Sequence, residues 1–300
     1  MRKISLLFVL LFIMSSCSNE LKENGSPEYI QSINDWHSKR IENLKKPDGW
    51  LSLVGLYWLN EGVNTFGSAK DNDIVFPEGT ADDHIGEFIK KDSVITLKVY
   101  DNVKVLSKEM PVKETILIDD TKPNRTVLNH KNLIFYVIKR GPDKYGIRLK
   151  DTHSKLLKEF KGIERFPVNV DWKFNAKFVP YNPPKELNIP TIIGTIEKEM
   201  SLGKLVFSKD GNEYSLDVTN AGDSFFIVFA DETSGEETYG AGRFLYTSKP
   251  DSNGIVVLDF NKAYNPPCAF TKYATCPLPT KDNYLKLKVT AGEKNYGHGH

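Results

Sequence analysis

The sequence predicts an all-β protein with one N-terminal helix, a sandwich-like first half and an antiparallel meander barrel in the second half. Beyond Trp50, short runs of β-branched and aromatic residues are bounded by Gly, Asn, Asp or Pro, as strands joined by tight turns are. The alternation of strand and helix patterns that would indicate a parallel sheet does not occur. A length of 300 residues is enough for one large β unit or two ordinary domains.

The N-terminus reads as an export signal. Arg2 and Lys3 are followed by an apolar run from Ile4 to Ile13, which is too short for an ordinary membrane-spanning helix. Met14-Ser15-Ser16-Cys17 then resembles a bacterial lipobox. We expect residues 1–16 to be a lipoprotein signal peptide and Cys17 to carry the lipid, which holds the protein at a membrane. The alternative is a plain signal peptide with Cys17 incidental.

Residues 17–28 are polar and read as a tether. Ser18 stands where an Asp would retain a lipoprotein at the inner membrane in enteric-type sorting. We therefore expect a lipid-anchored protein of the bacterial cell envelope, at the outer membrane on its periplasmic or surface side. The formal net charge of +1 argues against nucleic acid as a partner, because dedicated nucleic-acid binders usually carry a basic excess.

A helical unit over residues 29–48 precedes the strands. Apolar and aromatic side chains recur near helical spacing from Tyr29 to Leu44, and Lys45-Lys46-Pro47-Asp48-Gly49 ends the pattern. The apolar stripe is expected to pack on the body that follows. The residues of this stripe are Ile30, Ile33, Trp36, His37, Ile41 and Leu44.

The strand patterns fall into two groups, a sandwich-like unit over residues 49–164 and a meander or barrel unit over residues 165–300. Turn-rich residues near Glu164–Asp171 separate them, and Lys209-Asp210-Gly211-Asn212 is a hairpin signal. The second group has about eight strands, a number that can close a small barrel. The expected strands are Asp73–Phe76, Val94–Val99, Thr115–Ile118, Leu133–Lys139, Gly146–Lys150, Asp171–Val179, Ile189–Ile196, Gly203–Phe207, Glu213–Val218, Phe225–Ala230, Thr238–Tyr246, Ile255–Phe260 and Lys286–Val289.

The segment 259–279 is too rich in proline for a helix or a central strand. We expect an ordered loop, because long structureless connections are uncommon in compact domains. Its Cys268 and Cys276 form an even pair in an exported protein, so a disulfide is the simplest interpretation. Two buried free thiols are an alternative, and a metal pair or a thiol nucleophile is a third.

Several motifs resemble a known family. The chain is similar, from about Trp36 to Tyr296, to the bacterial and archaeal domain-of-unknown-function family 1684, most specifically in Asn265-Pro-Pro-Cys and Cys276-Pro-Leu-Pro. That family has no assigned reaction, so the resemblance marks a functional surface without supplying chemistry. The other matching segments are Gly49–Leu56, Arg140-Gly141, Gly146–Arg148, Gly162–Pro167, Thr238–Leu245, Asp259–Pro279 and Ala291-Gly292-Glu293.

Residues 62–100 also resemble, more weakly, the forkhead-associated β-sandwiches, which bind phosphothreonine. The spacing of Asn64–Ser68, Asn72–Phe76 and Ala81–His84 carries this resemblance. In that family an Arg follows the glycine and a Ser opens the last motif, whereas Ser68 and Ala81 stand here. Without the Arg, the bidentate contact that makes phosphate recognition strong is missing, so a shared scaffold is expected without phosphopeptide binding.

Arginines in apolar β segments indicate a ligand site, because a buried guanidinium needs a carboxylate or an anionic ligand. Structural pairing with an acid is the alternative for each of them. We expect Arg148, Arg165 and Arg243 to face one pocket beneath the 259–279 loop and to bind a small polar or anionic molecule. The other expected ligand-binding residues are Tyr239, Asp259, Asn261, Tyr264, Asn265 and Glu293.

No familiar catalytic or metal motif accompanies these residues in the sequence, so neither a metal nor a cofactor is expected. A rival hypothesis is a metal-independent hydrolase that uses a carboxylate pair such as Asp231 with Glu237 or Asp259. A third is a structural or assembly role for the lipoprotein through an exposed sheet face.

Overall fold

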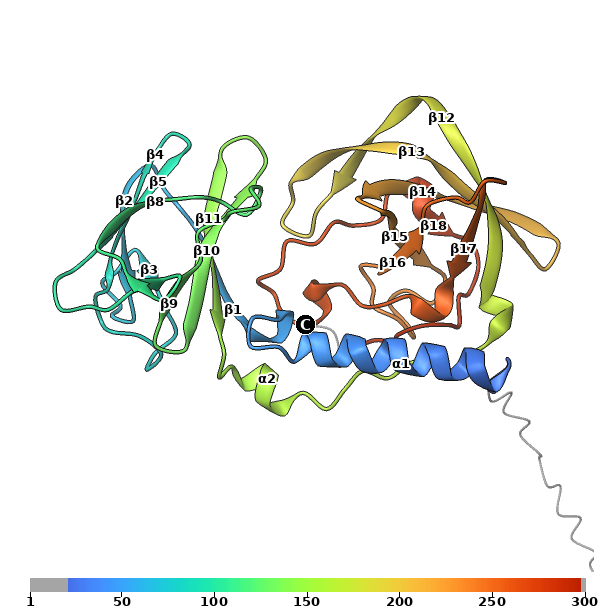
Figure 1. The fold of residues 1–300 in the computed structure, drawn as a ribbon, viewed down its shortest axis with the longest axis horizontal. Coiled ribbons are helices and arrows are strands. Elements are labelled where there is room, and N and C mark those ends of the chain that lie inside the picture. Colours follow the sequence, from blue (N-terminus) through green and yellow to red (C-terminus); the bar gives the residue numbers. More distant parts are fainter. Residues whose placement is uncertain (1–20, 298–300) are drawn as a thin grey trace, which may run out of the picture.

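The computed structural model describes residues 21–297, and the predicted signal peptide, Ser18 and Cys17 lie outside them. Two β units stand side by side, and one long helix, α1 (Pro27–Leu44), runs beneath the second unit, on the right in Figure 1. This confirms the predicted fold class, a mostly β chain with one main helix near the N-terminus. The helix begins where the Ser26 side chain accepts a hydrogen bond from the backbone N–H of Tyr29, which is the usual capping arrangement.

The first unit is a sandwich of two antiparallel-dominated sheets. One sheet has the order β1-β11-β10-β9-β6-β7 and the other β3-β2-β4-β5-β8. The strands are β1 (Leu53–Trp58), β2 (Gly62–Gly67), β3 (Ile74–Val75), β4 (Gly86–Lys91), β5 (Val94–Val99), β6 (Leu106–Ser107), β7 (Met110–Pro111), β8 (Glu114–Leu117), β9 (Leu128–His130), β10 (Leu133–Arg140) and β11 (Lys144–Asp151).

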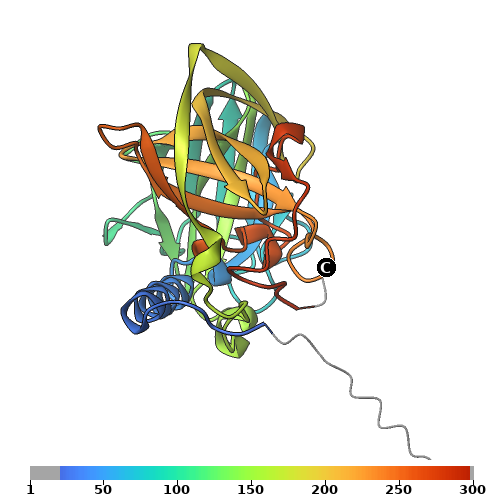
Figure 2. The ribbon, with the colours of Figure 1, turned by 90° about the vertical axis from the view of Figure 1, so that its right-hand side faces the viewer.

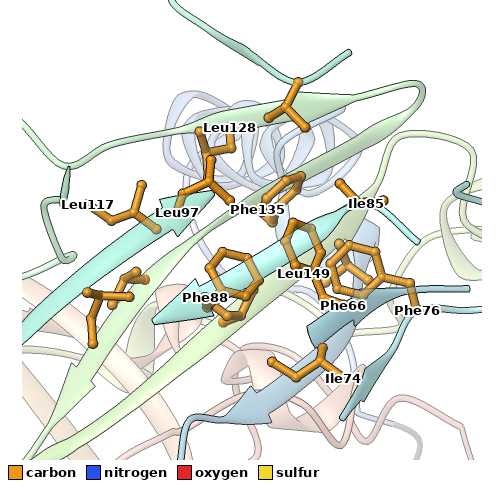
Figure 3. Close-up of a cluster of buried hydrophobic side chains, with 14 of the residues drawn as sticks. Phe66, Ile74, Phe76, Ile85, Phe88, Leu97, Leu117, Leu128, Phe135 and Leu149 are labelled. Carbon is orange, nitrogen blue, oxygen red and sulfur yellow. The ribbon is translucent and has the colours of Figure 1, made fainter. Parts of the chain in front are cut away.

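Alternating side chains explain why these strands pack as two layers. In β5, Ile95, Leu97 and Val99 are buried, whereas the residues between them face outward. Aromatic rings fill the space between the sheets: Phe66 stacks on Phe88 with ring centroids 4.2 Å apart (Figure 3). The edge of the Phe135 ring meets Phe66 at 5.9 Å, a favourable arrangement of two rings.

The second unit is one sheet that curls into a nearly closed barrel. Its order is β16-β15-β14-β13-β12-β17, and β18 pairs with β15. The two outer strands of this order meet through the Thr247 hydroxyl, which donates to the Val257 carbonyl at 2.9 Å. The strands are β12 (Lys173–Pro190), β13 (Ile196–Lys209), β14 (Asn212–Ala221), β15 (Ser224–Asp231), β16 (Arg243–Ser248), β17 (Ile255–Asp259) and β18 (Tyr284–Leu285).

Short helical turns connect these strands. The loop predicted over residues 259–279 is ordered by two 3-10 turns and by an antiparallel bridge between Phe244 and Tyr264. The short elements are α2 (Lys155–Glu159), η1 (Trp50–Ser52), η2 (Val170–Trp172), η3 (Phe260–Lys262), η4 (Pro267–Ala269) and η5 (Lys281–Asn283).

Several strand predictions differ from the structure. The predicted strand Ile189–Ile196 contains the turn between β12 and β13, where the Thr191 hydroxyl bonds that of Thr195 and Gly194 adopts a φ of +78°. Residues 238–242 form a loop before β16, and residues 286–289 follow β18 without forming a strand. The Lys209–Asn212 hairpin is confirmed, with φ positive at Asp210 and Gly211.

Apolar clusters join the helix and the two units. Leu53 of β1 packs with Val228 and Phe244 of the second unit, and Leu44 of α1 packs with Leu51 and Phe270. Figure 2 views α1 nearly end-on, below the strands. None of the helices within residues 21–297 is long and apolar enough to span a membrane.

Candidate functional site

Three adjoining hollows form a cleft along the second unit, which we call the interunit cleft because its arginine hollow lies between the two β units. The aromatic hollow of about 400 Å³ and the arginine hollow of about 390 Å³ share Trp50, Phe244 and Pro267 as walls. A smaller acidic hollow of about 200 Å³ shares Phe226 and Tyr246 with the aromatic hollow. The volumes of the aromatic and arginine hollows fall in the usual range of small-molecule sites, and the acidic hollow is smaller.

Arg148 of β11 is the central cation of the arginine hollow. Its side chain is 4% exposed, and its guanidinium forms no ion pair with any described residue. Nη2 donates to the Thr275 hydroxyl at 3.2 Å, while the buried Nε has no hydrogen-bond partner. The guanidinium lies over the Trp50 ring, 5.2 Å from its centroid. Arg148 therefore holds a buried positive charge without a neutralising carboxylate.

Arg140 of β10 converges on the same hydroxyl. Its Nε donates to the Thr275 oxygen at 2.9 Å, and its Nη1 pairs with Asp120 at 3.0 Å. Antiparallel pairing places Arg140 opposite Lys144 and Tyr136 opposite Arg148, so both arginines come from one two-stranded segment. Thr275 thus marks the point where two guanidinium groups approach each other.

Thr275 is held there by the backbone of the 259–279 loop. The Ile192 N–H donates to the Cys276 carbonyl at 2.9 Å, and the Thr271 hydroxyl donates to the Leu53 carbonyl at 3.2 Å. The loop is therefore fixed at one side to the β12–β13 turn and at the other to β1. Its position depends on both units.

Lys150 adds a third cation behind Trp50. Its ammonium lies 5.6 Å from the Trp50 ring centroid and hydrogen-bonds the Asp48 carbonyl. Burial lowers the pKa of Lys150 to about 8, and the nearby charge of Arg148 acts in the same direction. The cation-rich side of the cleft therefore penalises additional positive charge.

The walls of the aromatic hollow are ring faces and one arginine. The Tyr264 ring stacks parallel to that of Tyr246 at a centroid distance of 6.3 Å, and the Arg40 guanidinium lies 4.4 Å over Tyr264. Phe226 meets the edge of Phe244 at 4.9 Å. Tyr246 is 51% exposed, so much of this ring faces the open hollow.

Arg40 is positioned from behind by buried groups. Its Nε pairs with Glu293 at 3.0 Å and its Nη2 donates to the Asn265 carbonyl at 2.9 Å. The Asn265 N–H donates to the other Glu293 oxygen at 2.7 Å. Burial raises the pKa of Glu293, and the charge of Arg40 opposes this shift. Asn265 and Glu293 thus support the hollow through Arg40.

Glu197 of β13 faces both the arginine and the acidic hollows. Burial raises the pKa of Glu197, with further contributions from Glu199 and Asp120, whereas Arg140 lowers it. The carboxylate is half-buried and forms no ion pair in the part of the chain that the structure describes. Glu197 is therefore one of several ionisable groups that line the cleft.

Arg243 does not face the cleft, which corrects the prediction. It is fully buried and pairs with Asp231 at 2.8 Å. It also donates to the Val289 carbonyl at 3.0 Å and to the Ala291 carbonyl. These contacts join β16 to the C-terminal segment, so the role of Arg243 is structural, as the alternative interpretation had it.

Arg165 and Tyr239 also lie apart from the cleft. Arg165 hydrogen-bonds the Asn34 side-chain oxygen on α1, and its backbone forms an antiparallel bridge with Glu293. The Tyr239 hydroxyl donates to the Cys268 carbonyl at 3.1 Å, and burial raises its pKa. The predicted convergence of Arg148, Arg165 and Arg243 in one pocket is therefore wrong, and Arg148 alone lines the cleft.

Asp259 and Asn261 anchor the helix. The Tyr29 hydroxyl lies 3.0 Å from both Asp259 carboxylate oxygens, and the Asn261 amide donates to the Tyr29 oxygen at 3.0 Å. Asn261 also donates to the Asn169 carbonyl at 2.8 Å. Two carboxylates of the rival hydrolase hypothesis therefore serve structural contacts, because Asp259 is engaged here and Asp231 pairs with Arg243.

Cys268 and Cys276 are free thiols in the structure, not the predicted disulfide. The Cys268 N–H donates to the Cys276 sulfur at 3.2 Å. A hydrogen bond between the side chains lowers the pKa of the Cys268 thiol, and the same bond together with burial raises that of Cys276. This corresponds to the alternative of two buried thiols, with Cys276 in the wall of the arginine hollow.

Sequence reasoning missed Arg40, Trp50, Tyr246 and Thr275 as members of the site. Trp50 and Thr275 lie inside segments that carried the family resemblance, so that signal pointed to them without giving a role. Arg40 stands among the residues of the apolar stripe of α1, between His37 and Ile41, and a long cation there is ordinarily expected to extend into solvent. Within residues 21–297, no group of three His, Cys, Asp or Glu side chains is placed to hold a metal ion.

Comparison with protein families supports one of the resemblances directly. Residues 158–294 match the family described as protein of unknown function, DUF1684. The matched residues contain β12 to β18, the 259–279 loop and Glu293. The resemblance predicted from sequence is confirmed over this segment, which supplies one wall of the cleft.

Solved structures give weaker likenesses. An uncharacterized protein of Haloarcula marismortui, solved by solution NMR, is 27% identical over 46% of this chain and 78% of its own, with a TM-score of 0.39. The FHA domain of FhaA is 17% identical over 32% of this chain and 97% of its own, with a TM-score of 0.23. The comparison with curated proteins gave no significant match.

Proposed function

We propose that the protein binds a small anionic molecule in the interunit cleft, with the anionic group held by Arg148 and Arg140. The observation that carries this proposal is the buried Arg148 guanidinium that pairs with no carboxylate. Burying an unpaired charge is costly, and the usual remedies are a counter-ion or a ligand of opposite charge. A carboxylate, phosphate or sulfonate would supply the missing charge and accept from the guanidinium donors.

Arg243 shows how this chain buries an arginine for structure alone. That guanidinium has the Asp231 carboxylate and several backbone carbonyls as partners. Both guanidinium groups lie over an aromatic ring, but the only side-chain hydrogen-bond partner of Arg148 among the described residues is the Thr275 hydroxyl, and no carboxylate pairs with it. The contrast favours a binding role for Arg148, in a cleft between the units instead of within the second unit alone.

The test is an NMR titration with methanesulfonate, a small anion that stays ionised at ordinary pH. Its binding should shift the side-chain Nε–H signal of Arg148 in a saturable manner, and Arg148→Met should weaken binding at least about tenfold, the loss of one charge-assisted contact. Arg125→Met is the matched control. Arg125 also lies over an aromatic ring, that of Tyr136, but it is exposed and outside the cleft.

Two results would overturn the proposal. One is a titration in which no signal from Arg148, Arg140 or Thr275 moves with added methanesulfonate. The other is equal binding by the wild type and Arg148→Met when both variants give well-dispersed spectra. A structural arginine would produce this second result.

We also propose that Cys17 is lipidated and holds the protein in the bacterial cell envelope, at the outer membrane. The basic residues, the apolar run and the lipobox-like Met14–Cys17 support this. The full-length protein should enter the detergent phase of Triton X-114 and carry lipid on its N-terminal peptide by mass spectrometry. Cys17→Ser should remain in the aqueous phase or keep its signal peptide. An unmodified wild-type N-terminus would contradict lipidation.

A further inference from the structure

The arginine hollow does not end at the anion position but continues into the aromatic hollow. Trp50, Phe244 and Pro267 line both. A ligand whose charged group lies at Arg148 therefore has room to extend along Trp50 toward Tyr264 and Tyr246. The combined shape offers one charged end and one apolar end.

We infer that the ligand of the cleft is an aryl anion, a carboxylate, phosphate or sulfonate attached to a flat aromatic ring system. This inference rests on the proposed function and adds the chemical class of the ligand body. The ring system would occupy the aromatic hollow, which has a volume of about 400 Å³. Its charged group would remain between Arg140 and Arg148.

The walls of the aromatic hollow expose the flat faces of aromatic rings to a ligand. Tyr246 and Tyr264 are nearly parallel, with an interplanar angle of 10°. Tyr246 is 51% exposed, which leaves an aromatic surface without a complete set of neighbours. Flat rings stack on such faces with a gain beyond that of buried area, whereas a saturated chain gains the area term alone.

The second wall of the hollow favours the same chemistry. Arg40 lies over Tyr264 at 4.4 Å and is fixed by Glu293 and the Asn265 carbonyl. A guanidinium held in this orientation presents its own flat surface, which stacks on aromatic rings. Because Glu293 neutralises its charge, Arg40 contributes shape and stacking more than attraction for a second anion.

Three further candidates lack such support. The apolar side chains Ile196, Met200 and Leu202 on β13 are exposed, but nothing in the structure shows what covers them. The acidic hollow contains Glu197, Glu199 and Asp217, and Asp217 is already engaged by Lys185 and Tyr181. Cys268 and Cys276 are free thiols, and within residues 21–297 they belong to no group of side chains that could hold a metal ion.

The experiment compares four sulfonates that share one permanently charged group: methanesulfonate, cyclohexanesulfonate, benzenesulfonate and 2-naphthalenesulfonate. Calorimetry or NMR on the wild type should show affinity rising along the series, with 2-naphthalenesulfonate at least about tenfold tighter than methanesulfonate. Benzenesulfonate should bind more tightly than cyclohexanesulfonate, since the two have bodies of similar size and only one has an aromatic face. Trp36 and Trp50 line the aromatic hollow and provide a fluorescence readout.

Two variants locate the ring. Tyr246→Ala should remove most of the advantage of 2-naphthalenesulfonate and leave methanesulfonate binding unchanged. Tyr284→Ala is the matched control, because Tyr284 is also 51% exposed but lies outside the aromatic hollow. Arg148→Met should weaken both ligands. A thermal melt of each variant identifies any loss of folding.

The outcomes separate this inference from the proposed function. Equal affinity along the series, or a cyclohexyl ligand as tight as the phenyl ligand, overturns the aryl assignment while binding at Arg148 stands. Tight naphthyl binding that Tyr246→Ala leaves intact also overturns it. If neutral naphthalene binds and Arg148→Met has no effect on binding, the anion site is overturned, whereas binding of an aromatic ring in the aromatic hollow stands.

Discussion

At the scale of single residues, the cleft depends on how each charge is compensated. Arg243 and Arg148 are both buried arginines on strands and both lie over an aromatic ring, yet Arg243 pairs with a carboxylate and Arg148 hydrogen-bonds a hydroxyl. Glu197 is an acid that lines the arginine hollow. Burial raises its pKa, so it stays neutral to a higher pH than an exposed glutamate does. Protonation of Glu197 would therefore make the arginine hollow more positive.

Protonation of Glu197 should strengthen anion binding. Its pKa is raised above the ordinary value of 4.5, so the negative charge is lost as pH falls through the raised value. Methanesulfonate affinity should therefore increase over that interval, with Arg140, Glu199 and Asp120 as the neighbouring charges. Because the folded pKa exceeds the unfolded one, the stability that neutral Glu197 contributes is present below pH 4.5 and is lost as pH rises through the raised value.

Glu197→Gln tests this expectation. The variant should bind methanesulfonate about threefold more tightly than the wild type at a pH above the raised pKa of Glu197, where the wild-type carboxylate is charged, and its affinity should vary less with pH. Glu213→Gln, an exposed acid on β14, is the control. A pH profile identical in wild type and Glu197→Gln would show that another group controls the charge of the cleft.

At the scale of elements, α1 is attached to the second unit at both ends. Tyr29 near its start bonds Asp259 and Asn261, and Arg40 in its last turns bonds Glu293. Ile33 is buried between these polar contacts, and Leu44 is buried at the end of the helix. The helix thus positions Arg40 and Trp36 as one wall of the aromatic hollow.

Removing the Tyr29 hydroxyl should loosen this attachment. Tyr29→Phe loses the bond to Asp259 and the bond from the Asn261 amide, which should lower the free energy of unfolding by about 1–2 kcal/mol. Urea denaturation measures the change, with Tyr284→Phe, an exposed tyrosine, as the control. An equal loss in both variants would show that the contact contributes nothing specific.

Sequence patterns predicted the elements that local residues determine. Val94–Val99 and the Lys209–Asn212 hairpin need only alternation and a turn with positive φ. The run Ile189–Ile196 has the composition of a strand, yet the Thr191 and Thr195 hydroxyls and Gly194 form a turn there. Within this run, turn chemistry prevailed over β propensity.

The site was less predictable than the strands because its contacts join distant residues. Arg148 was predicted because it is an arginine in an apolar strand pattern. Tyr264 was predicted because it lies in the proline-rich 259–279 loop. Arg243 was misassigned because its partner Asp231 lies on a neighbouring strand, and only the pairing of β15 with β16 brings them together. Arg40 was missed because its surroundings come from residues 264, 265 and 293.

At the scale of the whole molecule, the two units share apolar contacts across the cleft. Leu53 of β1 packs with Val228, Phe244, Ala274 and Cys276 of the second unit. Such contacts resemble a continuous core more than a mobile domain boundary. The walls of the cleft should therefore keep a fixed separation, and the two units should unfold together.

Leu53→Ala tests this coupling. Leu53 is 3% exposed, so the substitution should cost roughly 2–5 kcal/mol through lost burial and a cavity. Hydrogen exchange should show protection falling together in β10 of the first unit and β14 of the second. Leu202→Ala, which changes a 37% exposed leucine, serves as the control. Loss of protection in the first unit alone would mean that the units unfold independently.

The attachment of α1 also bears on the order of folding during synthesis. Tyr29 and Asp259 are 230 positions apart, and Arg40 and Glu293 are 253 apart. The helix leaves the ribosome before any of its partners, and the strands up to Asp151 can pair while Ile33 and Leu44 still face water. Docking of α1 is therefore among the last events, and contacts so distant along the chain slow folding. The aromatic hollow gains its helical wall only when the final residues have been made.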